Sequence, residues 1–309
     1  MKKFDIVTAL DICVDFLLHL GEVNPEFGQK EQIIRDYGVE LGGSCCIFAC
    51  QAAKLGLVTK GIGVAGQDSF GSLVLEKLGE AGVITEDIRR YSSIKTGMGA
   101  ALCKDNGDRA ILTYTGTIDG VNPEDFTEDI LRNTRHIHIG SYFLMKRLQR
   151  SYPKILKEAK KWGAAVSIDT NWDPDESWDS EIEDIFPYTD IYFGNENEAK
   201  AISGKQTVSE AVKLLSSKIP VVVIKMGEKG AAVYAEGKEY FRPALKVDVV
   251  DTVGAGDSFD AGFVYGWLKG YDFAKCLEIA CLCGSCSTTR AGGIEGQLTY
   301  GQLIEKIIL

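Results

Sequence analysis

The sequence predicts an α/β fold, a three-layer sandwich whose central sheet is mostly parallel and carries helices on both faces. Short apolar segments of the kind that form buried strands recur along the chain, and helical patterns lie between the later ones. Such alternation is typical of a parallel sheet, because each crossover helix returns the chain to the same edge. Hydrophobic residues make up 45% of the 309 residues and charged residues 25%, which is ordinary globular usage.

The strand-like segments follow one another at intervals along the whole chain. From the N-terminus they read FDIVTALDICVDF, LVTKGIGV, HIHIG, AAVSID, DIYFG and VVVIKMG. The segments SYPKILKEAKKWG and VSEAVKLLSSK lie between the later ones and have helical periodicity. No internal repeat or low-complexity linker divides the chain, so we expect a single domain covering 1–309.

Two segments depart from this alternation, at about 14–40 and 90–115. The second reads as two strands joined by a tight turn at Asn106 and Gly107, a pair that favours hairpins. Because the two segments are separated in sequence, they predict a small β lid that is inserted discontinuously into the domain.

Charge and composition exclude several classes of protein. The formal net charge of -10 argues against a nucleic-acid binder, since phosphate neutralisation needs clustered Lys and Arg. No apolar run reaches the roughly 18 residues of a membrane span, and the N-terminus lacks a signal-peptide pattern, so we expect a cytoplasmic protein with no membrane partner. The nine cysteines, including those of CLCGSC and the adjacent Cys45 and Cys46, are expected to be reduced thiols packed in the core.

The segment GIGVAG, Gly61–Gly66, matches the GxGxxG fingerprint of dinucleotide-binding folds. A dehydrogenase is therefore one alternative. The fingerprint expects its last glycine inside a helix, whereas here the helix-start residues Asp68 and Ser69 come after it. A strand end followed by a tight turn explains the segment better.

The segment VDTVGAGDSFDAG, Val250–Gly262, carries the strongest chemical signal. Gly254, Ala255 and Gly256 put little bulk around the backbone, and the apolar spacing that follows predicts a helix starting near Gly256. The first amides of a helix lack internal partners and lie at the positive end of its dipole, so this turn predicts an anion site. Asp257 is either a helix cap or, if the anion is a transferring phosphoryl group, the base that accepts a proton from an attacking hydroxyl.

The segment DTVGAGDSF resembles the C-terminal signature of the ribokinase-like sugar kinases, the phosphofructokinase B type family. GGSCCIFACQAAKLG followed by GIGVAGQDSFG resembles the N-terminal signature, and GNENEA, IKMGEKGA and TTRAGG match the family at three further points in the expected order. The resemblance covers nearly the whole chain. It implies a ribokinase-like fold and an ATP-dependent carbohydrate kinase, with Asp257 as the base and the amides of Gly254, Ala255 and Gly256 as the anion hole.

The resemblance also implies a nucleotide site. Asn195 and Glu198 of GNENEA match positions that organise Mg²⁺ and the ATP phosphates, with Glu198 acting through water; the alternative is a solvated helix start. Lys225 and Gly227 of IKMGEKG match the nucleotide pocket, although a surface lysine at a strand end explains Lys225 equally well. Cys281 takes a position near the adenine that asparagine often occupies in relatives.

A monovalent-cation loop is a further implication of the family likeness. Its ligands would be Asp251 and the backbone carbonyls of Val253, Thr288, Ala291 and Gly293. Carbonyl ligands leave no side-chain signature, so a site for K⁺ rests on the resemblance alone.

The sugar site is expected near the N-terminus. In ALDICVDF, Asp11 and Asp15 alternate onto one face of a strand. Asp15 matches the family aspartate that binds substrate hydroxyls, and Asp11 is a nearby candidate; the alternative is that both acids face solvent. Gly42 and Gly43 match the double glycine beneath the sugar, and Ser44 adds a candidate hydroxyl.

Three departures from the family pattern bear on specificity. Ile47 stands where many relatives have an asparagine that holds sugar hydroxyls. Asp173 of DTNWDP stands where relatives often have an arginine, which disfavours an acidic sugar or a sugar phosphate. With Cys281 near the adenine, these departures leave the chemistry intact and indicate a shifted specificity.

We therefore expect ATP-dependent phosphorylation of a primary hydroxyl on a neutral sugar, with fructose or another ketose as the first candidate. A nucleoside kinase of the same fold is the alternative, since Ile47 suits an apolar base pocket, and a catalytically silent sugar-binding regulator is a further one. Relatives often form homodimers through the lid, so the resemblance implies that assembly as an option here.

Overall fold

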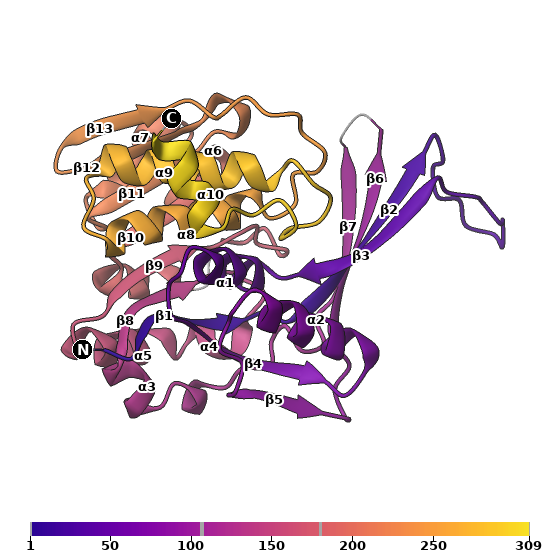
Figure 1. The fold of residues 1–309 in the computed structure, drawn as a ribbon, viewed down its shortest axis with the longest axis horizontal. Coiled ribbons are helices and arrows are strands. Elements are labelled where there is room, and N and C mark those ends of the chain that lie inside the picture. Colours follow the sequence, from indigo (N-terminus) through magenta and orange to yellow (C-terminus); the bar gives the residue numbers. More distant parts are fainter. Residues whose placement is uncertain (1, 106–107, 179–180, 309) are drawn as a thin grey trace.

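The computed structural model describes residues 2–105, 108–178 and 181–308, and it confirms the predicted α/β fold (Figure 1). Helices cover both faces of a large central sheet, and a smaller sheet projects from one end of the sandwich. The turn expected at Asn106 and Gly107 lies outside the described residues. Within the described ranges, no helix combines the length and the apolar character needed to cross a bilayer.

The central sheet is mostly parallel, as predicted. Its nine strands are β1 (Phe4–Leu10), β4 (Thr59–Gly66), β5 (Ile88–Tyr91), β8 (Thr134–Ile139), β9 (Ala165–Asp169), β10 (Ile191–Asn195), β11 (Val221–Lys225), β12 (Ala231–Ala235) and β13 (Lys238–Arg242). They lie in the order β13-β12-β11-β10-β9-β8-β1-β4-β5. Strands β11 to β5 in this order pair in parallel, whereas β12 and β13 add an antiparallel edge. The carboxyl ends of the parallel strands therefore meet at one edge, where α/β proteins bind ligands.

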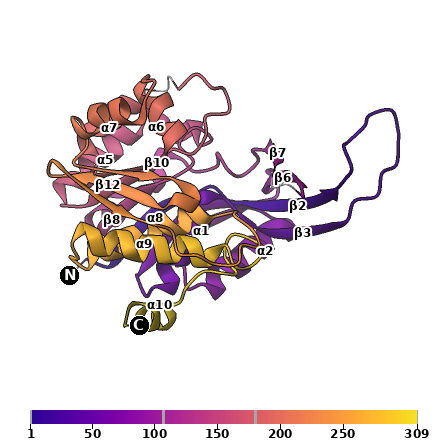
Figure 2. The same cartoon turned by 90° about the horizontal axis from the view of Figure 1, so that it is seen from above.

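The helices form two layers, one on each face of the central sheet. They are α1 (Ser44–Lys54), α2 (Ser69–Glu80), α3 (Glu128–Arg132), α4 (Lys146–Gln149), α5 (Tyr152–Lys161), α6 (Glu196–Ser203), α7 (Val208–Ser216), α8 (Ala255–Leu268), α9 (Phe273–Ser287) and α10 (Tyr300–Ile308). Helices α1, α8 and α9 lie on one face and α5, α6 and α7 on the other (Figure 2). Three short 3₁₀ helices, Pro123–Asp125, Ile182–Tyr188 and Gly227–Lys229, lie in the connections.

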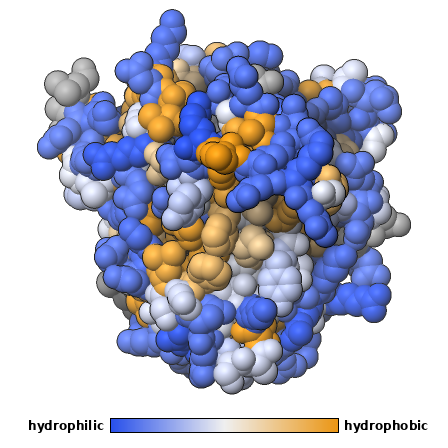
Figure 3. Space-filling view, turned by 90° about the vertical axis from the view of Figure 1, so that its right-hand side faces the viewer, coloured by the Kyte–Doolittle hydropathy of each residue, from blue (hydrophilic) through white to orange (hydrophobic). Residues whose placement is uncertain are grey.

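The smaller sheet has four strands, β2 (Cys13–Gly21), β3 (Asp36–Gly42), β6 (Gly97–Lys104) and β7 (Arg109–Tyr114), in the order β3-β2-β6-β7. It extends away from the sandwich in both ribbon views (Figures 1 and 2). Tyr37 on β3 and Ile111 and Leu112 on β7 are exposed apolar residues of this sheet. Seen from this end, the surface carries apolar residues grouped between hydrophilic ones (Figure 3).

One strand boundary differs from the sequence expectations. The segment FDIVTALDICVDF is not one strand: β1 belongs to the central sheet, β2 belongs to the smaller sheet, and Asp11 and Ile12 link them. The segment expected to leave the central sheet at about residue 90 does so after β5, which ends at Tyr91 and still pairs with β4. Alternation of side chains cannot reveal where a continuous extended chain changes sheet.

The GIGVAG segment also differs from expectation. All six residues lie inside β4, which ends at Gly66, so the expected strand end is confirmed and a tight turn within the segment is wrong. The expected helix start is confirmed, because Asp68 is the N-cap of α2 and its Oδ1 accepts a hydrogen bond from the Gly71 amide at 2.8 Å. The glycines therefore form no phosphate loop, and the dinucleotide-binding alternative loses its structural basis.

The cysteines are free thiols, and all except the half-buried Cys103 are buried. Burial raises the pKa of the thiols, to about 12 for Cys50 and for Cys281. A thiol with such a pKa stays protonated near neutral pH and packs as a small apolar group.

Candidate active site

Helix α8 begins at the predicted anion turn. Gly254 is its N-cap with a φ of 70°, and the helix starts at Ala255, one residue before the expected start. Glycine adopts this φ at no steric cost, and a β-carbon here would lie 2.8 Å from Cγ2 of Ile47 and 2.9 Å from the Cα of Gly293. Gly254 therefore permits both the tight turn and the close packing behind it. The first amides of a helix have no partner within the helix, and here the Ala255 amide donates to the Thr252 carbonyl outside it at 3.4 Å.

Asp257 is the third residue of α8 and does not cap it. Gly254 occupies the N-cap position and no side chain makes a capping bond there, so the interpretation of Asp257 as a cap is wrong. Burial raises the pKa of Asp257 to about 8, and the nearby Asp169 carboxylate adds to the effect, whereas Lys225 opposes it. A carboxyl group whose pKa lies near the working pH suits general-base catalysis.

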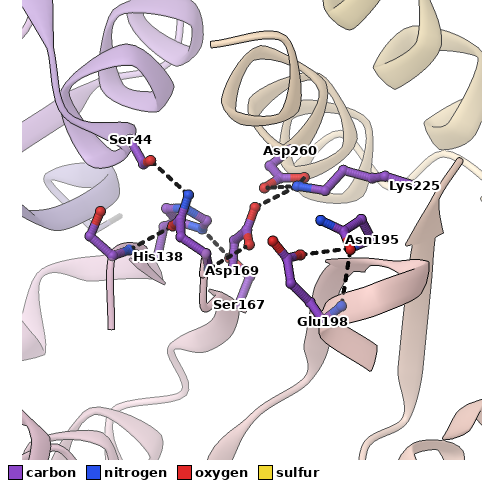
Figure 4. Close-up of polar contacts among 10 residues, drawn as sticks. Ser44, His138, Ser167, Asp169, Asn195, Glu198, Lys225 and Asp260 are labelled. Atoms are coloured by element: carbon purple, nitrogen blue, oxygen red, sulfur yellow. Dashed lines mark hydrogen bonds and ion pairs between the residues drawn. The ribbon is translucent and has the colours of Figure 1, made fainter. Parts of the chain in front are cut away.

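Lys225, the last residue of β11, is paired with buried acids beneath this turn (Figure 4). Its ammonium forms an ion pair with Asp169, the last residue of β9, and lies 3.3 Å from the carboxylate of Asp260 on α8. The three side chains are 17%, 4% and 0% exposed respectively, so the interpretation of Lys225 as a surface lysine is wrong. Burial opposes the charge of Lys225, but Asp169 and then Asp260 hold its pKa well above the ordinary value.

Asn195 and Glu198 form a capping box at the start of α6. Asn195 Oδ1 accepts hydrogen bonds from the amides of Asn197 at 2.9 Å and Glu198 at 3.0 Å, and Glu198 Oε2 accepts from the Asn195 amide at 2.7 Å. The expected helix start is therefore present. It is not a fully solvated one, because Glu198 is buried.

In the part of the chain that the structure describes, no group of three or more His, Cys, Asp or Glu side chains is placed to hold a metal ion directly, so a divalent cation at this edge of the sheet would keep water ligands. Burial, and next the Asp169 carboxylate, raise the pKa of Glu198, and the same two causes raise the pKa of Asp257. The charge of Lys225 lowers both pKa values, but its effect is smaller than that of burial and Asp169. Oxygen ligands and spare negative charge are what Mg²⁺ requires, and it commonly keeps several waters.

Asp11 links β1 to the start of α1. Its carboxylate accepts hydrogen bonds from the amides of Ser44 at 2.9 Å and Cys45 at 3.0 Å, and from the Ser141 hydroxyl. Burial raises the pKa of Asp11 to about 6, against the effect of these bonds. Asp11 is buried, so the solvent-facing alternative is wrong for it. Its side chain caps α1 from a distant segment, because the N-cap Gly43 has no side chain to do so.

Asp15 lies between glycines of the smaller sheet. A β-carbon on Gly42 would lie 2.6 Å from Asp15 Cγ, and one on Gly99 would lie 2.7 Å from Asp15 Oδ1. On Gly43, with a φ of 89°, a β-carbon would collide with the backbone carbonyl of Asp11. The predicted double glycine thus makes room for both acids. Burial, and next the Asp11 carboxylate, raise the pKa of Asp15 to about 6.

Three polar residues that the sequence did not single out complete this end of the site. Asn171, with a φ of 56°, donates from Nδ2 to the Ser44 hydroxyl at 2.8 Å and accepts from the Ser141 amide at 2.9 Å. Asp169 accepts a hydrogen bond from the Asn171 amide at 3.2 Å. The DTN triplet after a strand was the signal that could have identified Asp169 and Asn171, whereas nothing local marked Ser141.

The residues of the expected cation loop lie on neighbouring segments. The Asp251 carboxylate accepts from the amides of Val253 and Gly292, each at 3.0 Å. The Thr288 carbonyl accepts from the amides of Val250 at 2.8 Å and Asp251 at 3.2 Å. Both of its lone pairs are thus engaged, which makes Thr288 the weakest ligand candidate of the set.

A cavity of about 900 Å³ opens beside the anion turn. The candidates Lys225, Gly227 and Cys281 line it together with Ala255 and Gly256 of the turn. Its size suits a nucleotide. Asn195 is not among the described residues that line this cavity. Its other lining residues are mostly those of the connection from β13 to α8 and of α9, namely Ala244, Leu245, Lys246, Val247, Val249, Thr252, Phe259, Gly284, Ser285 and Thr288, with Glu228, Lys229 and Gly230.

Two of the departures from the family pattern do not face the sugar site. Ile47 is 3% exposed and packs against Gly254 and Gly293, so the expected change in hydroxyl contacts at this position is wrong. Asp173 is 3% exposed, and its carboxylate accepts hydrogen bonds from the amides of Asp175 and Trp178 at 3.0 and 2.7 Å. The backbone amides of its own loop solvate this carboxylate, so it is not directed at a substrate as the expected repulsion of a sugar phosphate requires.

Comparison with known proteins gives a family match over most of the chain. Residues 9–299 match the model of the pfkB family carbohydrate kinases. The chain is 31% identical over 264 residues to an ATP-dependent ribose-1-phosphate kinase of Halopiger xanaduensis, covering 85% of each chain. It is 28% identical over 286 residues to an ATP-dependent 6-phosphofructokinase of Thermoanaerobacterium thermosaccharolyticum, covering 90% of this chain and 86% of the relative.

Solved structures resemble the whole chain. A protein of E. coli described as a ribokinase II, in complex with ATP and Mg²⁺, superposes with a TM-score of 0.86 at 24% identity. A ribokinase of Arabidopsis thaliana complexed with ribose and ATP superposes with a TM-score of 0.85 at 24% identity. Each likeness covers 99% of both chains, and at this identity it establishes the fold.

Proposed function

Because this chain belongs to the pfkB family of carbohydrate kinases, we propose that it transfers the terminal phosphoryl group of ATP to a primary hydroxyl of a neutral sugar, with fructose or another ketose as the first candidate. The fold is ribokinase-like, and the enzyme is an ATP-dependent carbohydrate kinase. One observation carries the assignment of roles. Asp257 lies in the first turn of α8, between the nucleotide-sized cavity and the Ser44 end of the site.

The reaction follows from the positions of these groups. The sugar oxygen bonds to the terminal phosphorus of ATP while the bond from that phosphorus to the bridging oxygen breaks, and ADP leaves. Asp257 accepts the proton of the attacking hydroxyl, and the amides at Gly254–Asp257 stabilise charge on the phosphoryl oxygens. Mg²⁺, when bound, neutralises the phosphates, and Glu198 and Asn195 would hold it through water.

The sugar would lie against the double glycine. Asp15 would accept hydrogen bonds from its hydroxyls, since this half-buried carboxyl lies at the junction of the smaller sheet with the sandwich. Ser44 would contribute its hydroxyl, while Asp11 and Asn171 hold Ser44 in place. The smaller sheet acts as a lid on a single kinase domain of 309 residues, and closure would exclude water that otherwise attacks ATP.

Three further features belong to the proposal on family likeness. K⁺ would bind at the loop of Asp251 through the carbonyls of Val253, Ala291 and Gly293. The exposed apolar residues of the lid suit a homodimer formed through it. The protein would act in the cytoplasm.

A sugar phosphate is a second candidate acceptor. Arg109 on β7 donates to Thr252 Oγ1 at 3.2 Å, and its charge lowers the pKa of Asp15 against the larger effect of burial. The lid thus places a guanidinium between the sugar end and the anion turn. The two relatives compared above are named for sugar phosphates as acceptors, which supports including them in the test. Ile47 is buried under the turn and so gives no argument for a base pocket, but a nucleoside stays an alternative acceptor and is included in the test.

A screen of acceptors for ADP release tests the proposal. Fructose, ribose, fructose 6-phosphate, ribose 1-phosphate and adenosine would each be supplied with Mg²⁺ and ATP, and neutral ketoses are expected to give the highest kcat/KM. Asp257→Asn should lower the rate of ADP release by about two orders of magnitude, and Asp272→Asn is the matched control because Asp272 caps α9. Preference for adenosine, or ADP release at the wild-type rate in Asp257→Asn, contradicts the proposal; no stimulation by any acceptor favours a silent binding protein.

A further inference from the structure

Lys225 is held beneath the anion turn by two acids from different elements. Asp169 is the last residue of β9, and Asp260 lies one helical turn beyond Asp257 on α8. Asp260 is fully buried, with its carboxylate oxygens 3.3 and 3.4 Å from the Lys225 ammonium. Burial raises the pKa of Asp260, and in its protonated form Asp260 donates a hydrogen bond to the Asp169 carboxylate, which links the two carboxyl groups around the lysine.

The ammonium group reaches the turn itself. A β-carbon on Gly256 would lie 3.1 Å from Lys225 Nζ, and Lys225 and Gly256 both line the 900 Å³ cavity. An ammonium has three N–H donors. Asp169 and Asp260 accept hydrogen bonds from two of them, which leaves a donor for a further acceptor, and Lys225 itself lines the cavity.

Stability alone does not explain this group. Burying charged side chains costs desolvation free energy, and replacing a buried ionic group with apolar residues is often neutral or stabilising. If the phosphoryl group lies at the turn, Asp169, Asp260 and Lys225 would have a role in catalysis as well as a structural one. They would fix the direction of a charged donor before ATP binds, which electrostatic catalysis requires.

We propose that Asp260 is a positioning residue, which together with Asp169 holds Lys225 so that its remaining N–H donates to the terminal phosphoryl group of ATP. This inference rests on the proposed function, because it places that phosphoryl group beside Asp257. The α- and β-phosphates would then lie further along the cavity, away from Asp257. Lys225 therefore favours ATP over ADP, and Asp260 contributes to that preference only through Lys225.

Binding of Mg²⁺ with AMP-PNP and of Mg²⁺ with ADP, measured by isothermal titration calorimetry, tests this without any acceptor. The quantity of interest is the ratio of the two Kd values. Lys225→Met should reduce the preference for AMP-PNP about tenfold, the loss of one charge-assisted hydrogen bond. Asp260→Leu should produce a similar loss, because the leucine cannot hold either Lys225 or Asp169. Asp260→Asn should stay within about twofold of the wild type, since its amide has both an acceptor and a donor.

A double variant separates positioning from direct action. In the Lys225→Met background, Asp260→Leu should change the Kd ratio no further. Asp190→Asn is the matched control, because Asp190 pairs with Lys160 at the opposite edge of the sheet. Melting temperatures of all variants would report any loss of folding separately.

Two results overturn the proposal. One is an unchanged Kd ratio in Asp260→Leu that is accompanied by a lower melting temperature, as a structural role predicts. The other is an additive effect of Asp260→Leu in the Lys225→Met background. Failure of the proposed function looks different: nucleotide binding with the expected ratios, but no acceptor phosphorylated.

Discussion

The Nζ atom of Lys225 lies 3.1 Å from the position that a β-carbon would take on Gly256. Gly256 belongs to the anion turn and Lys225 to a strand beneath it, so a glycine at 256 is what allows the ammonium to approach the turn. Few real β-carbons have a contact this tight, so a side chain at this position must displace the ammonium by a few tenths of an ångström.

Gly256→Ala is therefore expected to reduce kcat by about tenfold, because small displacements of a preorganised donor weaken transition-state stabilisation. Steady-state kinetics with the preferred acceptor would measure the change. Gly79→Ala is the control, since an added β-carbon on this residue of α2 meets open space. Equal kcat values for Gly256→Ala and wild type would mean that the lysine has no role at the turn.

Gly254→Ala is expected to destabilise the protein rather than only slow it. An alanine at a φ of 70° is strained, and its β-carbon would lie within 3.0 Å of the Gly293 backbone, which cannot move as a side chain does. We expect the free energy of unfolding to fall by about 2 kcal/mol or more. Chemical denaturation would measure it; a loss of activity with unchanged stability would contradict this account.

Asp257→Asn is expected to lower turnover by about two orders of magnitude, with a smaller effect on ATP binding. In the wild type, kcat/KM for the acceptor should rise with pH through about 8, because burial and Asp169 raise the pKa of Asp257 and only the carboxylate accepts a proton. The residual activity of the asparagine variant should lack this dependence. A pH profile that is the same in both proteins would remove Asp257 from the role of base.

The free energy of unfolding should fall with rising pH because of Asp257, whereas kcat/KM should rise. A carboxyl whose pKa is raised to about 8 binds its proton more tightly in the folded than in the unfolded state, so its contribution is lost as pH rises from about 4 to 8. Asp257→Asn should gain in stability relative to wild type over this range. Urea denaturation at pH 5 and pH 8 would measure the difference; a relative loss at pH 8 would exclude the raised pKa.

His138 is expected to weaken the protein in acid. Its ring is stacked on Phe48 at 3.6 Å, accepts or donates a hydrogen bond at Ser167, and is buried, which lowers its pKa to about 3. The unfolded state therefore binds the proton first, and stability falls below about pH 6.5 by up to about 1.4 kcal/mol per pH unit. His138→Phe keeps the ring contact and should flatten this dependence. His19→Phe on β2 is the control, and equal acid sensitivity of His138→Phe and wild type would contradict the expectation.

Much of the fold could be predicted because its signals are local. The apolar segments that form β8 to β11 and the helical pattern of α5 are visible within short windows of sequence. The anion turn was visible for the same reason, since the glycines and the acid that form it are neighbours in the chain. The sequence also marked Asp257 as a candidate, but it did not decide whether Asp257 is a helix cap or a base.

The misses share one cause. Asp11 reads as an acid on a strand, yet its role comes from amides of Ser44 and Cys45, which are 33 and 34 residues away in the chain. The expectations for Ile47 and Asp173 rest on resemblance to the family's motifs, whereas the structure shows that both side chains are buried. Tertiary packing decides where a side chain points and which group it bonds, so a local sequence pattern cannot predict either.

By itself, the sequence determined the order of strands and helices and the place of the anion turn, because backbone preference and side-chain period act between near neighbours. Only the tertiary structure decided that Lys225 lies between Asp169 and Asp260, residues 56 and 35 positions away. The parallel sheet brings the ends of β9 and β11 to one edge and α8 lies across them, and separation along the chain carries no information about that distance.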